Sequence, residues 1–515
     1  MNAIELTLFA SRVSAICDEM GLVLRRAAFS PNIKDRLDFS CALFGPAGEL
    51  FAQAAHIPVH LGSMAYAMGD LVRARDWGVG DMLMVNDPYL GGTHLPDVTL
   101  IAPVFVNAGR DLVGFVANRA HHANIGCETP GSMPISTRLE EEGVIIPPTW
   151  LYRAGELQTG LPPLPDLGGD ELSGDFAAQA GANRVGVKRL ARLVEQLGQQ
   201  DYAEGMRQLN DYADRVTAAT LDTLIPGQYR FEDFLDDDGQ GSERIRLAVS
   251  IRITADRVEL DLGESADMVP GNLNCPESVA AAAVYYCFRC LMPAEAPACA
   301  GLFRRIHLRT RPGSIVNARR PAAVAAGNVE TSMRLVDLVF GALAQALPGQ
   351  IPAASQGTMN NIAMGHWDRD TGARWDYYET LAGGTGGGPR GPGLHCVHSH
   401  MTNTLNTPIE SLEMHYPLRV RRYARRRGSG GDGRQRGGDG VIREYEFLGP
   451  AQLTLLTERR TLAPWGLAGG AAGATGRNSL NGRELPAKTT LSVQAGDRLC
   501  IETPGGGGWG EPAVG

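Results

Sequence analysis

Residues able to bind a divalent cation stand at both ends of one apolar stretch in the first quarter of the chain. His94 and Asp97 precede the stretch, within the run THLPD, and the pair His121-His122 follows it. Imidazole and carboxylate groups are common ligands of divalent metals, and a set of three leaves a coordination position open. The residue types therefore predict an open-sided metal centre, provided that the intervening chain brings the two ends together.

The intervening residues predict two strands joined by a turn. Residues 98 to 106 (VTLIAPVFV) and 112 to 117 (LVGFVA) are apolar and β-branched, and the residues between them (NAGRD) are typical of a turn. In such a hairpin, the residue before the first strand lies beside the residue after the second. We therefore expect His94 and Asp97 to be neighbours of the histidine pair.

Two further histidines occur a short distance upstream, in the run HIPVH. His56 and His60 are separated by Pro58, which does not fit inside one continuous helix. The two histidines are therefore not expected to lie on one face of a helix. They are either polar groups around the metal centre or structural histidines, and the sequence leaves both readings open.

Candidate substrate-binding residues lie in the C-terminal third, in the run HCVHSHMTN. If this segment is a strand, His398 and His400 share one face, because side chains alternate along a strand. We predict that they line a substrate pocket together with Asn403. The alternative is a polar strand face with no ligand.

A glycine run at residues 383 to 388 offers backbone amides that could hold an anion. We predict that Gly384, Gly386 and Gly387 bind phosphate or substrate with Arg390, since a guanidinium pairs bidentately with such groups. The run is not a P-loop, because no Gly-Lys-Ser/Thr follows it. If ATP is used, we expect another chain to bind it.

The elements that must position these residues predict an α+β fold. Helical periodicity marks residues 3–27, about 60–75, 175–222, 276–293 and 330–347, whereas 38–54 and 227–263 show strand patterns. Glycine turns and short strands dominate from about residue 350. We predict three sub-domains: 1–225 with the metal centre, an α+β region at 226–348, and a glycine-rich β region at 349–515.

The composition excludes several classes of protein. A net charge of −9 over 515 residues argues against nucleic acid as a partner. We find neither a signal-peptide pattern nor the roughly 20 consecutive apolar residues of a membrane span, so we expect a cytoplasmic protein. Nine scattered cysteines suit reduced thiols better than a disulfide framework.

Several long motifs resemble the hydantoinase B/oxoprolinase family. Besides the metal-candidate stretches and HIPVHLGSM, they are AAVAAGNVETS at 322–332, ASQGTMNN at 354–361, HSHMTNTLNTPIESLE at 398–413 and TPGGGGWGEP at 503–512. Members of the family share the first histidine of the pair and have either His or Trp at the second position. The resemblance therefore implies that His121 is the third metal ligand. It also makes His122 and Asn124 catalytic candidates. Relatives carry Asp at the position of Asn124, and an amide is neither a base nor an anionic ligand.

The resemblance also implies a hetero-oligomeric, ATP-dependent enzyme. A hydantoinase A-like partner chain would bind ATP and phosphorylate a cyclic amide, such as a hydantoin, 5-oxoproline or a lactam. This chain would then complete ring opening with a divalent ion such as Zn, Mn or Fe. Two alternatives stay open: related ketone carboxylases contain a similar subunit, and the chain could be a non-catalytic scaffold.

Overall fold

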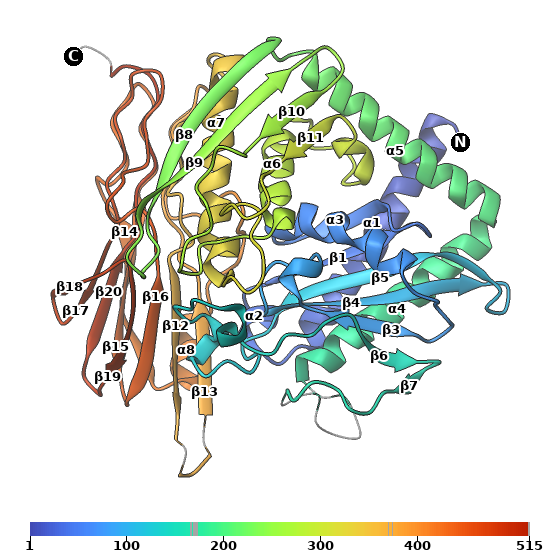
Figure 1. Cartoon of the computed structure of the whole chain (residues 1–515), viewed down its shortest axis with the longest axis horizontal. Coiled ribbons are helices and arrows are strands. Elements are labelled where there is room, and N and C mark those ends of the chain that lie inside the picture. The colour runs from blue at the N-terminus through green and yellow to red at the C-terminus, as the bar shows by residue number, and fades with distance from the viewer. Residues whose placement is uncertain (165–166, 168–171, 173, 369, 373, 513–515) are drawn as a thin grey trace.

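The computed structural model describes residues 1–164, 167, 172, 174–368, 370–372 and 374–512. Its strands form four separate sheets with helices packed against and between them, so the predicted α+β fold is confirmed. Figure 1 shows the N-terminal sheet at one end of the molecule and the C-terminal strands at the other. The Pro/Gly-rich stretch at 160–174, which the sequence predicts to be an irregular connection, lies partly outside the described residues.

The first sheet carries the candidate metal ligands. It is antiparallel, with seven strands in the order β2-β1-β5-β4-β3-β6-β7. The predicted hairpin is confirmed as β4 (Asp97–Val106) and β5 (Asp111–His121), and the register pairs Asp97 with His121. The remaining strands are β1 (Phe39–Phe44), β2 (Leu50–Ala55), β3 (Met82–Val85), β6 (Thr149–Arg153) and β7 (Glu156–Leu157).

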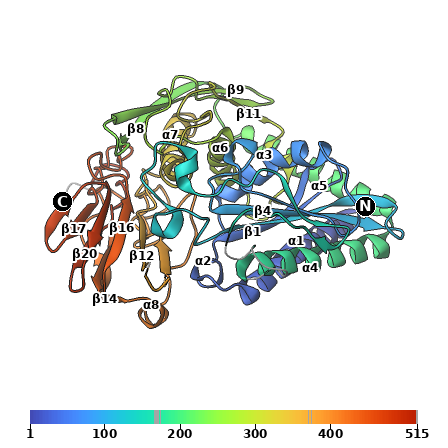
Figure 2. The ribbon, with the colours of Figure 1, turned by 60° about the horizontal axis from the view of Figure 1, so that its bottom comes forward.

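Alternation of side chains along these strands gives each face of the sheet its own helices (Figure 2). The even-numbered apolar residues of β4 share a core with α1 (Ala3–Ala27) and α4 (Gly174–Leu197). Ile101 of the same strand packs instead with apolar residues of α3 (Val59–Arg73). A further helix, α5 (Gln199–Leu221), follows α4. The helices predicted in this region are therefore confirmed.

The middle of the chain forms a four-stranded sheet and two buried helices. The strands are β8 (Gly227–Asp237), β9 (Glu243–Ile253), β10 (Val258–Asp261) and β11 (Ile306–Arg309), of which β10 and β11 are parallel. The predicted helices are present as α6 (Glu277–Leu291) and α7 (Ser332–Ala346). A π-helical turn, η6 (Gly327–Thr331), precedes α7, and such turns are common beside functional sites.

The C-terminal region forms two antiparallel sheets with their own apolar core. One sheet has the order β13-β12-β16-β19, with β12 (Asn361–Trp367), β13 (Arg374–Glu379), β16 (Ala451–Leu456) and β19 (Lys488–Val493). The other has the order β14-β15-β20-β17-β18, with β14 (Leu418–Arg426), β15 (Gly440–Phe447), β20 (Arg498–Glu502), β17 (Arg477–Leu480) and β18 (Arg483–Leu485). A short helix, α8 (Ile409–His415), precedes β14.

Glycine-rich segments of this region pack backbone against backbone. The Gly384 amide donates to the Pro504 carbonyl at 3.1 Å, and the Gly387 amide donates to the Gly507 carbonyl at 2.8 Å. A Cβ atom on Gly386 would lie 1.8 Å from the carbonyl oxygen of Ala353. The run therefore consists of glycine because no side chain fits, and the Gly384 and Gly387 amides are not free to bind an anion as predicted.

No described helix combines the length and the apolar character needed to cross a membrane. All nine cysteines, each of which the structure describes, are free thiols, as expected from their spacing.

Candidate metal centre

The start of β1, the end of β5 and the start of β4 lie side by side at one edge of the sheet, and the residues there form one row. Asp97 is paired with His121, and the His121 amide donates to the Asp38 carbonyl at 3.0 Å. Neighbours across strands direct their side chains to the same face, which here is the face that α3 covers. The loop before β4 adds His94 to this row.

The donor atoms of the three predicted ligands converge in the protein interior. The Oδ1 atom of Asp97 lies 3.2 Å from Nε2 of His94 and 3.2 Å from Nδ1 of His121, and the two nitrogens are also 3.2 Å apart. Bonds of about 2.0–2.1 Å from a tetrahedral ion place its ligand atoms about 3.3 Å from one another. The three side chains therefore fit a divalent ion in the positions that they already occupy.

Neighbouring groups hold each ligand in this orientation. Nδ1 of His94 donates to the Ala325 carbonyl at 3.3 Å, which leaves Nε2 as the nitrogen that faces the other ligands. The second oxygen of Asp97 accepts from Thr93 and lies 3.4 Å from Nε2 of His60. Of the two open readings for His60, the structure therefore supports the one that places it beside the centre.

The protonation preferences of two of the three side chains, Asp97 and His121, also suit a metal ion. Burial opposes ionisation of Asp97, but the His94 charge and the hydrogen bonds from three histidines hold its pKa well below the ordinary value. Burial lowers the pKa of His121, whereas the Asp97 carboxylate outweighs burial at His94 and raises the pKa of that ring. Metal ligands must be an ionised carboxylate and neutral imidazoles. Asp97 and His121 already favour these protonation states in the absence of an ion.

The donor atoms face a small cavity of about 20 Å³ among buried side chains, a size that accommodates about one water molecule. The Tyr378 ring stacks on His121 at a centroid distance of 4.9 Å. Polar residues from the whole length of the chain complete the lining: Asp38, Asn328, Thr380, Thr402 and Thr404. The centre is therefore assembled from the first sheet, the turn before α7 and the C-terminal region.

Asp38 is the lining residue of most chemical interest that the sequence did not indicate. Its carboxylate lies 3.9 Å from Nη2 of Arg36 and lines the cavity beside His121. One signal is present in the sequence, since Asp38 directly precedes a strand. This position lies beside the metal centre only because β1 pairs with β5, and no local pattern predicts that pairing.

The two residues predicted as catalytic, His122 and Asn124, do not line the cavity. His122 points to the opposite face of the sheet, where its Nε2 atom lies 2.9 Å from Oε1 of Gln179 on α4. The Asn124 side chain accepts from the Gly126 amide at 2.9 Å and so stabilises a turn. The Asn at this position therefore does not alter the lining of the cavity.

The predicted histidine strand is not a strand. His400 has a φ of 57°, and no strand is assigned to this described segment. Thr402 and Thr404 reach the cavity, whereas Asn403 between them is exposed. Burial and nearby Arg36 lower the pKa of His398 to about 3.

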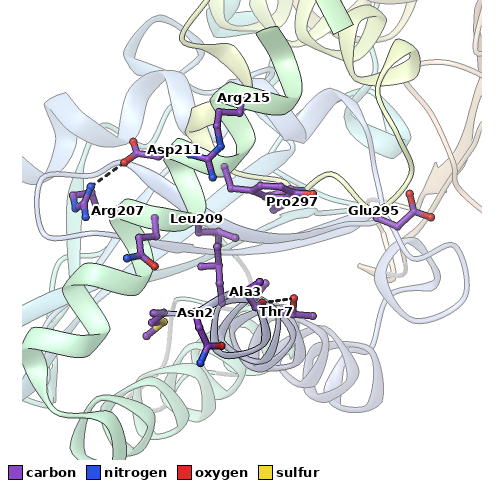
Figure 3. Close-up of a pocket in the computed structure, with 14 residues that line it drawn as sticks. Asn2, Ala3, Thr7, Arg207, Leu209, Asp211, Arg215, Glu295 and Pro297 are labelled. Carbon is purple, nitrogen blue, oxygen red and sulfur yellow. Dashed lines mark hydrogen bonds and ion pairs between the residues drawn. The ribbon is translucent and has the colours of Figure 1, made fainter. Parts of the chain in front are cut away.

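Two other candidate positions lie away from the metal centre. His56 packs against the Phe39 ring with a centroid distance of 4.7 Å. A wider groove lies between the start of α1, α5 and residues 295–297 (Figure 3). Its polar groups pair with one another, as Arg207 does with Asp211 at 3.0 Å. Among the described residues, the set that could hold a metal ion is His94, Asp97 and His121, and none of these lines the groove.

Glu142 supports the loop that orients His94. One of its carboxylate oxygens accepts from the Val324 amide at 2.8 Å and from the Ala325 amide at 2.9 Å. Burial raises the pKa of Glu142 to about 7. The protonated form is therefore favoured in the folded chain at mildly acidic pH.

We expect Glu142→Gln to flatten the pH dependence of stability of the metal-free chain. Because the folded pKa is raised, the contribution of Glu142 is fully present below its ordinary value of 4.5 and is lost as pH rises through about 7. Urea unfolding across this range should show a loss for the unsubstituted chain that exceeds the variant's by about 3 kcal/mol. Glu140→Gln, at an exposed position, should behave like the unsubstituted chain. Equal slopes for all three would contradict this role.

The four-sheet α+β fold matches a solved structure over almost the entire chain. The crystal structure of the ATP-dependent caprolactamase from Pseudomonas jessenii has a TM-score of 0.90 and 27% identity, covering 99% of this chain and 91% of that one. The sequence gives the family directly: the chain is a member of the hydantoinase B/oxoprolinase family, whose model matches residues 2–512.

Relatives in this family differ in length. The 5-oxoprolinase 1 of Arabidopsis thaliana is 39% identical over 99% of this chain, which spans only 42% of that protein. A protein from Pseudomonas sp. that is named as the B-type component of a D-/L-hydantoinase is 30% identical over 96% of this chain and 87% of its own length. The chain thus corresponds to less than half of the oxoprolinase and to most of the hydantoinase component.

Proposed function

We propose that this chain is the B-type component of an ATP-dependent cyclic amide hydrolase and that His94, Asp97 and His121 hold a divalent metal ion at its reaction centre. The observation that carries the proposal is the mutual 3.2 Å spacing of the three donor atoms. The names of the relatives and of the matching structure, which refer to oxoproline, hydantoin and caprolactam, support the substrate class.

A divalent ion, when bound, supplies Lewis-acid polarisation of a carbonyl or phosphoryl oxygen. The residues of this chain supply the rest of the chemistry. Asp38 lines the same cavity as the three ligands, and its carboxylate can accept a proton from the attacking water. Thr93 and His60 fix the orientation of Asp97. The Tyr378 ring and the threonine side chains separate the centre from bulk water, which strengthens electrostatic interactions there.

Phosphorylation of the amide is assigned to the partner. The glycine run that resembled an anion cradle in the sequence uses its Gly384 and Gly387 amides for backbone packing. A relative that is named as one component of a hydantoinase supports a hydantoinase A-like partner. Phosphorylation of the amide oxygen would activate the amide carbon toward addition of water. Protonation and departure of the ring nitrogen from that adduct would break the C–N bond and leave an acyl phosphate, and its hydrolysis by a second water would release phosphate and the ring-opened acid.

Metal content and turnover test this function together. We expect the purified chain to contain about one divalent ion per molecule and, with its A-type partner, to open the ring of 5-oxoproline, a hydantoin or caprolactam with ATP hydrolysis. His94→Ala should lose both properties, and His307→Ala, at an exposed position, should keep both.

The same assay separates the alternatives. Bicarbonate-dependent consumption of a ketone without ring opening would identify a carboxylase component instead. Full activity of His94→Ala in a metal-free complex would support the scaffold interpretation and contradict the proposal.

A further inference from the structure

A second, much larger cleft begins at the segment that lines the metal centre. Thr402 and Thr404 line the small buried cavity, whereas His400 lines a cleft of about 630 Å³. The other walls come from the end of α6, from α7 and from the loops near residues 350 and 390. A cleft of this volume suits a small molecule. The chemistry proposed for the metal centre does not involve it.

His400 is held in an uncommon conformation on the wall of this cleft. Its φ of 57° lies in the left-handed region, which residues other than glycine seldom adopt. Its ring lies 5.8 Å from the ring of Tyr286 and 5.8 Å from the ring of Phe340. Backbone strain of this kind persists only where the surroundings impose it, and it is frequent at ligand sites.

A buried carboxylate lies beside the imidazole of His400. Nε2 lies 3.3 Å from Oδ1 of Asp337, and the other oxygen of Asp337 pairs with Arg459 at 3.2 Å. Nε2 forms no hydrogen bond with the described residues. The Asp337 side chain is only 1% exposed, so this arrangement is fixed from inside the protein.

Arg390 places a positive charge at the rim of the same cleft. It stands at the tip of a tight turn in which the Gly388 amide donates to Gly391 at 3.0 Å and the Gly391 amide donates to Gly388 at 3.2 Å. The side chain is exposed, and no ion pair joins it to the described residues. An unpaired guanidinium on a rigid turn is suited to a carboxylate or a phosphate group.

We propose that this cleft binds a small ligand that carries a carboxylate or phosphate on a compact, partly apolar body. Arg390 pairs with the oxyanion, His400 makes a hydrogen bond through its imidazole ring, and the Tyr286 and Phe340 rings contact the body of the ligand. The proposal does not depend on the metal chemistry. A substrate with its own carboxylate and free phosphate share the recognised group, and the experiment separates them.

Calorimetric titration of the purified full chain tests this site with three probes. 5-Oxoproline carries a carboxylate on a lactam ring, 2-pyrrolidinone is the same ring without it, and inorganic phosphate has no ring. We expect 5-oxoproline to bind with a Kd on the order of 1 mM or tighter and 2-pyrrolidinone to give no measurable binding. Phosphate that competes with 5-oxoproline would extend the site to both oxyanions, and lack of competition would restrict it to carboxylates.

Variants locate the binding in the cleft. Arg390→Gln should weaken 5-oxoproline binding about 10-fold or more, and His400→Asn should weaken it while tolerating the left-handed backbone. Arg483→Gln, at an exposed position of β18, should have no effect. Binding should persist in His94→Ala, which separates this site from the metal centre. Equal binding of 2-pyrrolidinone, binding unchanged by Arg390→Gln, or no binding of 5-oxoproline would each overturn the proposal.

Discussion

Replacing Asp97 by asparagine is expected to remove the metal ion and the activity while preserving the shape of the side chain. One carboxylate oxygen faces both His94 and His121, and the other is held by Thr93 and His60. An amide offers one oxygen, and its NH₂ group cannot accept from these donors. Loss of a partner that only orients a ligand costs about 10–100-fold in metal affinity, so loss of this ligand should exceed about 100-fold.

Metal content by mass spectrometry and kcat/KM of the complex with the A-type partner measure this effect. The unfolding free energy should also fall, by about 3 kcal/mol or more, because the variant loses one member of a buried charge cluster. Asp81→Asn is the matched control. Asp81 is also buried but accepts hydrogen bonds from Gly78 and Ala154, away from the centre.

The control variant should lose stability yet keep its metal ion. A full complement of metal and unchanged turnover in Asp97→Asn would contradict the assignment of this residue as a ligand.

Substituting Gly386 by alanine is expected to destabilise the fold severely, although it adds a single methyl group. The new Cβ atom would lie 1.8 Å from the carbonyl oxygen of Ala353 and 2.4 Å from its carbonyl carbon. Overpacking commonly costs about 1–3 kcal/mol, and a clash with backbone on a neighbouring segment should reach or exceed the upper value. Urea unfolding of the purified chain, or its yield as folded protein, measures the loss.

Gly391→Ala provides the comparison for this substitution. A Cβ atom there meets nothing within 4 Å, although the residue belongs to the same glycine-rich segment. We expect a change within about 0.5 kcal/mol. Equal effects of the two substitutions would show that close backbone packing is not what requires glycine in this run.

The sequence predicted that His94, Asp97 and His121 lie together because the relevant geometry is local. A turn between two apolar strands necessarily joins their outer ends, and the register of Asp97 with His121 follows from that hairpin. Asp38 could not be found in the same way, because it reaches the centre through the pairing of β1 with β5. His122 was placed on the wrong side, although alternation along β5 would have directed it away from His121.

The glycine run shows a different limit of sequence reasoning. Taken alone, residues 383–388 are compatible with an anion-binding loop, since glycine leaves backbone amides accessible. In the structure the Gly384 and Gly387 amides donate to the Pro504 and Gly507 carbonyls, and Cβ atoms at these two positions would meet the backbone of Gly438 and Gln435. A requirement imposed by segments so distant in the chain leaves no local periodicity. The predicted strand at His398 and His400 is absent as well, and the His400 ring contacts Phe340 of α7, a neighbour that no local pattern indicates.

The buried cavity around the donor atoms has a consequence for the way in which the protein would acquire the proposed metal ion. The ligands His94, Asp97 and His121 lie early in the chain, whereas Tyr378, Thr402 and Thr404, which shut them in, are synthesised much later. During translation the N-terminal part emerges first, so the nascent hairpin can capture an ion before the C-terminal walls close over it. Similar ligand sets accept several divalent ions, and availability then decides among them. If the proposed ion is captured at this stage, its identity in a mature molecule would depend on which ions were available in the cell during synthesis.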